Sequence, residues 1–371
     1  MNILLLASHA VAEFDDVRMF HDLGHNVFAP GGYEDPSSTG EGIRPALPQV
    51  PYFADLAALC RIQRETFGAT YGEPGPAIDW AKARLHPDVI DWADVIIAHH
   101  FVDRWIGGQW DAIKHKRVVW RTCGQSNPEL ERFMGRFVDQ GLQVVRYSPA
   151  EARYFGELGA FAGQDALIRF GKYPDDYGPW VGDMEVVGNV TQDLLNRGDA
   201  CGYSFWCLAT EGLPTAPAGK GSELLPGGLG ALSYEGMLDY LRHIRAYLYM
   251  GTTPASYTLG LIEAMLSGVP VVSIGAKAWG QGWHGSRLFE AAVDVPLAER
   301  YEGEVIRSIV SEDACFDSPE AARQALRWLI EYPDKAANIS QAQRARAVAL
   351  FGIETVGAQW QEFLHHTEAR P

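Results

Sequence analysis

The sequence predicts an α/β fold in which buried parallel strands alternate with helices. Short apolar runs at 2–7 and 271–274 are typical of strands covered on both faces. Leu259, Ile262 and Leu266 repeat at spacings of three and four, which indicates a helix between such strands. The 371 residues, 47% hydrophobic and 21% charged, suffice for two globular domains.

The stretch 247–275 holds a complete strand, loop, helix and strand. Gly268 and Pro270 end its helix, because proline cannot continue a helical turn. The loop before the helix is rich in hydroxyl groups, including Thr253, Ser256 and Thr258. Unpaired N–H groups and the helix dipole favour an anion at such an end, so we expect a phosphate there. An ordinary capping loop is the alternative.

Glu263 lies one helical turn beyond Leu259. Its carboxylate only accepts hydrogen bonds and could hold a pair of sugar hydroxyls. The alternative is a solvated glutamate on a surface helix.

The run ASYTLGLIEAMLSGVPVV, at 255–272, resembles the donor-binding motif of family-4 glycosyltransferases. That motif has two glutamates eight positions apart, then Ala-Met and Gly-x-Pro-Val-Val. Glu263 matches the second glutamate, which the family uses on the nucleotide ribose, while the first falls on Ala255. The resemblance implies the GT-B fold, two Rossmann-like domains facing each other across a cleft. It also implies retaining transfer of a hexose from a nucleotide-sugar.

The resemblance also implies the domain organisation. We expect an N-terminal Rossmann-like domain at 1–178 on the acceptor side and a C-terminal one at 179–350 on the donor side. Residues 351–371 would form a helix that crosses back onto the N-terminal domain. An apolar stripe suited to that role is formed by Val356, Trp360, Phe363 and Leu364.

Two cations hold the donor pyrophosphate in the family, one in a Gly-Arg pair and one in a Lys-Gly pair. Asn189 and Arg197 occupy those places, so Arg197 is the charge that remains. The turn from Gly219 to Ser222 resembles the family's Gly-x-Gly turn at the nucleobase. Lys220 within it is either a second phosphate cation or an ordinary loop lysine. The predicted donor-binding residues are Glu263, Ser256, Tyr257, Thr258, Lys220 and Gly219.

Polar residues follow two predicted strands of the first domain, at the sheet edge where open α/β folds bind ligands. His99 and His100 follow the strand at 94–98, and at most one of them can face a ligand. Gln125 follows the strand at 118–120, where the family often has a histidine. It either contacts a sugar or belongs to a helix cap. The predicted catalytic residues are Arg197, Gln125 and His99.

Net charge limits the choice of acceptor. The formal charge of −16 disfavours duplex nucleic acid, so a small molecule, a glycan or a lipid head group is the expected acceptor. A modified DNA base remains a minority alternative because of one basic patch. That patch comprises Lys114, Lys116, Arg117 and Arg121.

No metal and no resident cofactor are expected. No two aspartates lie two positions apart, so an Asp-x-Asp metal motif is absent, and a UDP- or GDP-sugar would act as co-substrate. The sequence has neither a membrane-spanning run nor a signal pattern. Its five cysteines form no Cys-x-x-Cys pair. These features favour a cytoplasmic protein, with peripheral membrane association and oligomeric state left open.

Two alternative functions remain. A sugar-nucleotide epimerase has the same architecture, and a non-catalytic nucleotide-sugar binding protein would explain the altered motif. Release of nucleotide from a donor panel, with and without acceptors, distinguishes the three.

Overall fold

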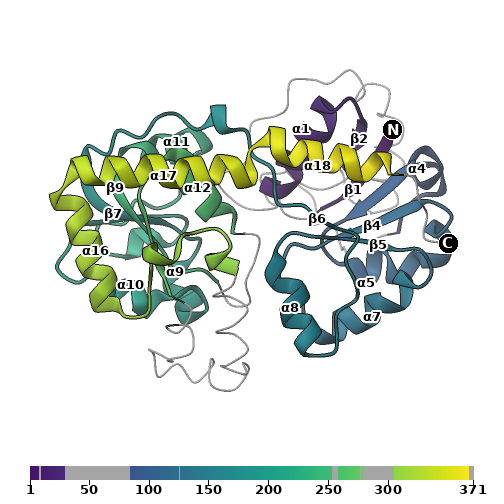
Figure 1. Cartoon of the computed structure of the whole chain (residues 1–371), viewed down its shortest axis with the longest axis horizontal. Coiled ribbons are helices and arrows are strands. Elements are labelled where there is room, and N and C mark those ends of the chain that lie inside the picture. Colours follow the sequence, from purple (N-terminus) through teal and green to yellow (C-terminus); the bar gives the residue numbers. More distant parts are fainter. Residues whose placement is uncertain are drawn as a thin grey trace. The chain divides into compact units, whose positions relative to one another are not determined.

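The computed structural model describes residues 1–7, 10–29, 84–124, 126–252, 258–275, 278 and 305–366. The sequence also predicts a helix at 56–67 and offers His9 and an aromatic loop at 279–284 as candidate ligand contacts, and all three lie outside the described residues. The chain divides into two compact units (Figure 1). Unit 1 comprises Met1–Tyr147, Glu151–Lys172 and Ile353–Pro371, and unit 2 comprises Ser148–Ala150 and Tyr173–Gly352. Each unit contains one parallel sheet, which confirms the predicted α/β class.

The unit 1 sheet has the strand order β2-β1-β3-β4-β5-β6, with every pairing parallel. Its strands are β1 (Asn2–Leu6), β2 (Asn26–Phe28), β3 (Val95–Ala98), β4 (Arg117–Arg121), β5 (Gln143–Arg146) and β6 (Ala166–Leu167). The helices that accompany them are α1 (Ala10–Asp22), α4 (Pro87–Trp92), α5 (Val102–Trp105), α6 (Trp110–Ile113), α7 (Pro128–Val138), α8 (Pro149–Glu157) and α18 (Ile353–His365). Because β2 and β3 flank β1 on opposite sides, the strand order reverses at β1 and β3.

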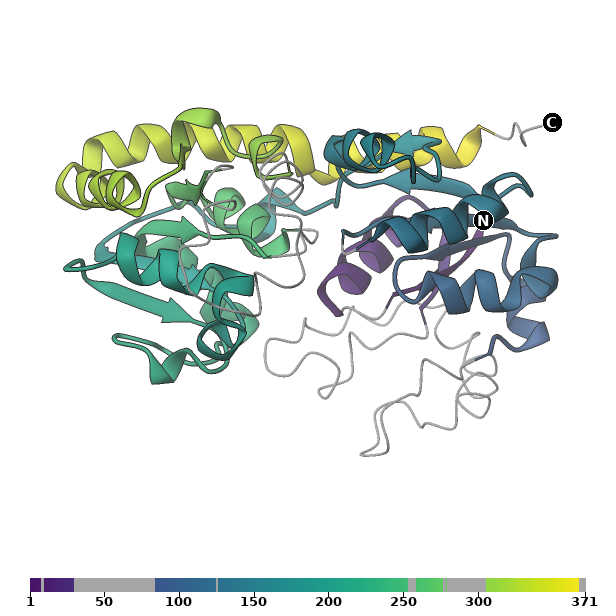
Figure 2. The ribbon, with the colours of Figure 1, turned by 90° about the horizontal axis from the view of Figure 1, so that it is seen from below.

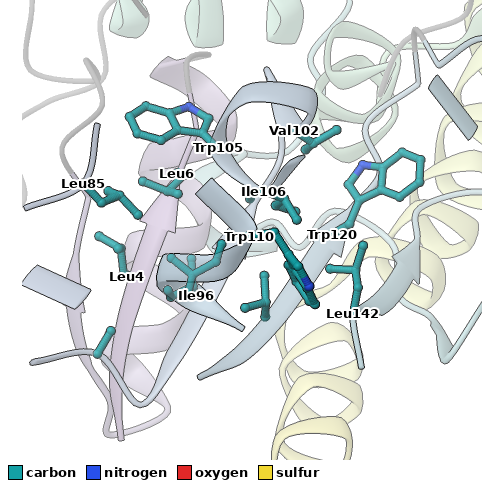
Figure 3. Close-up of a cluster of buried hydrophobic side chains, with 14 of the residues drawn as sticks. Leu4, Leu6, Leu85, Ile96, Val102, Trp105, Ile106, Trp110, Trp120 and Leu142 are labelled. Carbon is teal, nitrogen blue, oxygen red and sulfur yellow. The ribbon is translucent and has the colours of Figure 1, made fainter. Parts of the chain in front are cut away.

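Alternate side chains of these strands enter two separate cores, as the two-residue period of a strand requires. Leu4 and Ile96 join a core with Trp105, Trp110 and Trp120 (Figure 3). The neighbouring strand residues point to the opposite face, where α1 and α18 supply the other core. Helices therefore cover both faces of the sheet.

The C-terminal helix α18 belongs to unit 1. Val356, Trp360 and Leu364 are buried in the same core as α1, and both views show α18 beside α1 (Figures 1 and 2). The Arg117 guanidinium donates to the carbonyls of Phe363 and Leu364, each at 2.7 Å. The stripe seen in the sequence thus attaches the end of the chain to the first sheet.

The unit 2 sheet has the order β11-β10-β9-β7-β8, again with parallel pairings. Its strands are β7 (Met184–Val190), β8 (Thr215–Ala218), β9 (Ile244–Tyr249), β10 (Val271–Ile274) and β11 (Cys315–Phe316). Its helices include α9 (Leu194–Arg197), α10 (Tyr203–Ala209), α11 (Tyr234–His243), α12 (Leu259–Ser267), α16 (Pro319–Glu331) and α17 (Pro333–Phe351). The strand order reverses between β7 and β9, because β8 and β9 flank β7.

The junction between the units falls at Lys172 and Tyr173, earlier than the expected boundary at 178. The segment that follows is bonded to unit 2. Trp180 Nε1 donates to the Ile244 carbonyl at 2.8 Å, and the backbone N–H groups of 181 and 182 donate to the Arg242 carbonyl. These bonds explain why the turn-rich segment groups with the second sheet.

Within the described parts of the chain, the helices are all too short or too polar to cross a bilayer.

Candidate functional site

Three loops meet the carboxyl edge of the unit 2 sheet where its strand order reverses. They follow β7 at 191–193, β8 at 219–221 and β9 at 250–252. Open parallel sheets bind ligands at this edge, beyond the reversal point. The strand order of the unit 2 sheet therefore indicates this edge as the candidate donor site.

Gln192 joins two of these loops. Its side-chain Oε1 accepts from the Lys220 backbone N–H at 2.9 Å, and its carbonyl accepts from Arg197 Nη1 at 3.4 Å. The Asp193 backbone N–H donates to the Lys220 carbonyl at 2.7 Å. Arg197 and Lys220 are both exposed. Arg197, at the end of α9, and Lys220, in the loop after β8, are thus connected through Gln192 near one edge of the sheet.

Gly219 allows the loops after β7 and β8 to lie close together. Its φ is +110°, a region that strongly favours glycine. A Cβ at this position would lie 2.5 Å from the Thr191 carbonyl oxygen. A side chain here would push the loop after β8 away from the loop after β7.

Helix α12 begins beside the same edge. Its N-cap Thr258 is buried with φ 55° and ψ 31°, a left-handed conformation that β-branched residues rarely adopt. Ser256, Tyr257 and Gln125 lie outside the described residues. The structure therefore describes Thr258 of the predicted hydroxyl-rich turn, together with the helix that follows it.

Glu263 is buried in α12, with 5% of its surface exposed. The Tyr177 hydroxyl donates to its Oε1 at 3.4 Å. Burial raises the pKa of the nearby Tyr247 hydroxyl, and the negative charge of Glu263 raises it further. Glu263 is thus a buried, partnered carboxylate, which excludes the solvated-residue alternative.

Asn189 has a structural role in the sheet. It is 2% exposed, and its Nδ2 donates to the Leu248 carbonyl at 2.9 Å, which links β7 to β9. The position that corresponds to the family's first cation therefore braces two strands.

His99 is enclosed in a buried charge cluster of unit 1. Its Nε2 lies 3.2 Å from Asp16 Oδ2, and Arg121 Nε lies 3.5 Å from the same oxygen. Lys172 Nζ lies 2.6 Å from Asp15 Oδ2. The His99, Asp16 and Arg121 side chains have at most 1% of their surface exposed. His99 is therefore packed away from solvent.

Electrostatics fix the ionisation of this cluster. Burial lowers the pKa of His99, so its neutral form is favoured. Burial alone would raise the pKa of Asp16, but the charge of Arg121, the hydrogen bond from His99 and the charge of Lys172 hold it below its usual range. The sequence analysis missed this cluster. The acidic pair Asp15 and Asp16, on a predicted helix between the apolar residues Phe14 and Val17, was the signal that could have revealed it.

A second buried group lies beneath the loop that leads to Gln125. The Thr122 hydroxyl donates to Glu151 Oε2 at 2.5 Å, while Arg146 forms two bonds, of 2.7 and 2.8 Å, to the carboxylate of Glu131. Burial raises the pKa of Glu151 to about 7, against the lowering effect of Arg146. The negative charge of the nearby Glu131 adds to the effect of burial and further favours a protonated Glu151. The sequence analysis missed this group also.

The predicted basic patch is not a continuous exposed surface. Arg121 is fully buried against the rings of Phe170 and Trp360, at 4.2 and 5.0 Å from their centroids. Arg117 binds α18, and Lys114 pairs with Asp111 at 2.7 Å. The patch argument for a DNA acceptor is therefore wrong.

Among the residues that the structure describes, no three His, Cys, Asp or Glu side chains cluster as metal ligands would.

Two Rossmann-like parallel sheets and a C-terminal helix attached to the first of them define the GT-B class, which confirms the predicted fold. The chain is similar to sucrose-phosphate synthase from Thermosynechococcus elongatus, with a TM-score of 0.61 and 13% identity over 98% of both chains. It is equally similar to HepE from Anabaena in complex with UDP and glucose, with a TM-score of 0.61 and 14% identity over 98% of this chain and 99% of HepE.

A third similar structure is a glycosyltransferase from Rickettsia africae, with a TM-score of 0.58 and 12% identity over 99% of both chains. At these identities the likeness establishes the fold. No protein-family model matches the sequence, and a search of curated proteins found no match.

Proposed function

We propose that this protein is a family-4-type glycosyltransferase that moves a hexose from a nucleotide-sugar donor to an acceptor with retention of configuration. The observation that carries the proposal is that the Arg197 guanidinium and the Lys220 backbone both bond to Gln192 at the carboxyl edge of the unit 2 sheet. Two exposed cations on one ligand-binding edge suit a diphosphate. HepE, which shares the fold, has been solved with UDP-glucose.

Each donor-site residue has a distinct proposed role. Glu263 accepts hydrogen bonds from the ribose hydroxyls, and Gly219 allows the loop after β8 to approach the nucleobase. Arg197 and Lys220 hold the pyrophosphate together with Ser256, Tyr257 and Thr258. Negative charge builds on the leaving diphosphate as the glycosidic bond breaks, so fixed cations stabilise the transition state more than the ground state.

The residues of unit 1 are proposed to serve the acceptor side. Gln125 is proposed to hydrogen-bond the transferred sugar. His99 lies within the closed Asp16 and Arg121 cluster, so we assign it to positioning rather than to contact with substrate. The proposed acceptor is a small molecule, a glycan or a lipid head group, and the proposed location is the cytoplasm.

Nucleotide release from a panel of UDP- and GDP-sugars, with and without acceptors, tests this function. A transferase releases nucleoside diphosphate and responds to its acceptor. An epimerase changes the sugar without releasing nucleotide, and a binding protein does neither. Arg327→Ala is a matched control for Arg197→Ala, because Arg327 is also an exposed arginine of unit 2 but lies within α16. Equal activity of these two variants would contradict the role of Arg197.

A further inference from the structure

Tyr177 connects the start of unit 2 to the carboxylate proposed to hold the donor ribose. It is 3% exposed, and its hydroxyl donates to Glu263 Oε1 at 3.4 Å. The two residues are far apart in the sequence, since Tyr177 precedes β7 and Glu263 lies within α12. Their contact therefore depends on tertiary packing and not on local helix geometry.

Arg344, from α17, holds the backbone of Tyr177 independently of the tyrosine hydroxyl. Its Nη2 donates to the Tyr177 carbonyl at 3.1 Å, and its Nε donates to the Leu266 carbonyl at 2.8 Å. One guanidinium thus joins the Tyr177 backbone to the last turn of α12. Removal of the tyrosine hydroxyl alone should leave this attachment in place, so the hydroxyl can be tested separately from the packing.

A carboxylate has about four positions at which it can accept hydrogen bonds. The Tyr177 hydroxyl uses one of them. A fixed donor also restricts rotation of the Glu263 side chain before the ligand arrives, and pre-organisation of this kind raises affinity without a new ligand contact.

We propose that Tyr177 is a positioning residue for the donor nucleotide, and that its hydroxyl orients Glu263 toward the ribose. The proposal rests on the proposed function, because it takes Glu263 as the ribose acceptor. It assigns to Tyr177 a role that does not require contact with the ligand.

The test is calorimetric titration of UDP and GDP into the parent and Tyr177→Phe, continued with whichever nucleotide the parent binds more tightly. We expect Tyr177→Phe to weaken binding by about threefold to tenfold, less than loss of a direct charged hydrogen bond. The 2′-deoxy nucleotide should lose less on the same substitution, because one of the two ribose hydroxyls is already missing. A merely structural tyrosine would weaken both nucleotides equally, which would overturn the proposal.

A double-mutant cycle shows whether the effect of Tyr177 on nucleotide affinity depends on Glu263. If Tyr177 acts through Glu263, adding Tyr177→Phe to Glu263→Gln should change affinity by less than about twofold, so the two substitutions are not additive. Full additivity would contradict the proposal. Tyr240→Phe is the matched control, because it removes a buried hydroxyl of unit 2 that contacts Ala216 and Asn189. It should leave the preference for ribose over deoxyribose unchanged.

The outcomes distinguish failure of this proposal from failure of the proposed glycosyltransferase function. Tight binding by the parent, with an unaffected Tyr177→Phe variant, removes the role of Tyr177 alone. Absence of binding of both nucleotides to a folded parent removes the proposed donor site and the role of Tyr177 together.

Discussion

At the scale of residues, buried carboxyl groups in the two units differ in their surroundings. Asp16 lies beside a guanidinium, which holds its pKa low, and Glu263 accepts from a tyrosine hydroxyl. Glu151 accepts from Thr122, and burial raises its pKa to about 7. These environments predict that removal of each charge will have a different consequence.

Glu263→Gln tests the proposed ribose contact directly. The substitution keeps the size of the side chain and an oxygen that can accept from Tyr177, so the fold should persist. Loss of the charge should cost about 1.5–3 kcal/mol of nucleotide affinity, or about one to two powers of ten in Kd. Calorimetric titration of the nucleoside diphosphate measures this, and an unchanged Kd would remove Glu263 from the site.

Glu151→Gln should alter how stability depends on pH. Because the pKa of Glu151 rises from 4.5 to about 7 on folding, its protonated form stabilises the parent. That contribution is complete below pH 4.5 and is lost as the pH rises through 7. The parent should therefore lose about 3 kcal/mol of unfolding free energy across this window relative to the variant, which cannot ionise.

Urea unfolding of the parent and the variant across this pH window measures the difference. Glu157→Gln is the control, because Glu157 is a more exposed glutamate of the same helix, α8. Parallel pH profiles for the parent and Glu151→Gln would show that Glu151 ionises normally in the folded protein.

At the scale of elements, local signals predicted α12 better than its surroundings. The helix ends at Ser267 with Gly268 at φ +80°, as the glycine and the following proline indicate. The backbone of its N-cap, Thr258, is strained, and no sequence pattern predicts this strain. Strand β8 was not predicted, because Pro217 in its centre argues against a strand. The effects of glycine and proline on neighbouring residues can thus be predicted from the sequence, whereas backbone strain that packing imposes cannot.

Trp360→Ala should destabilise unit 1 by about 3–5 kcal/mol, because it deletes a fully buried indole. The ring lies 5.0 Å from that of Phe20, and the Arg121 guanidinium lies over it. Thermal or urea unfolding measures the loss. Gln361→Ala changes an exposed neighbour in the same helix and should stay within about 0.5 kcal/mol of the parent. Similar effects of the two substitutions would contradict the attachment of α18.

At the scale of the whole molecule, apolar strand runs and helix periodicities predicted the α/β class, and the resemblance to family-4 glycosyltransferases implied two Rossmann-like units. Burial of individual polar residues could not be predicted, because it depends on partners distant in sequence. His99 meets Asp16 from α1, Glu151 meets Thr122 from the end of β4, and Glu263 meets Tyr177. Each pairing follows from strand order and helix packing, which spacing along the chain does not encode.

Transfer should continue when divalent ions are removed. The prediction rests on the absence of an Asp-x-Asp motif and on the cations Arg197 and Lys220, which would carry the charge of the diphosphate. Nucleotide release in EDTA should remain within about twofold of the untreated rate, a change in barrier of about 0.4 kcal/mol. Complete loss in EDTA, restored by magnesium or manganese, would refute a metal-independent mechanism.

The central claim is that a nucleoside diphosphate binds at the carboxyl edge of the unit 2 sheet. The most direct measurement is calorimetric titration of UDP and GDP into the parent, Arg197→Ala and Arg327→Ala. The account predicts binding of one of these nucleotides to the parent and to Arg327→Ala with the same Kd. It predicts about tenfold to hundredfold weaker binding to Arg197→Ala, the cost of one charge-assisted hydrogen bond. Equal binding by all three proteins, or by none, would contradict it.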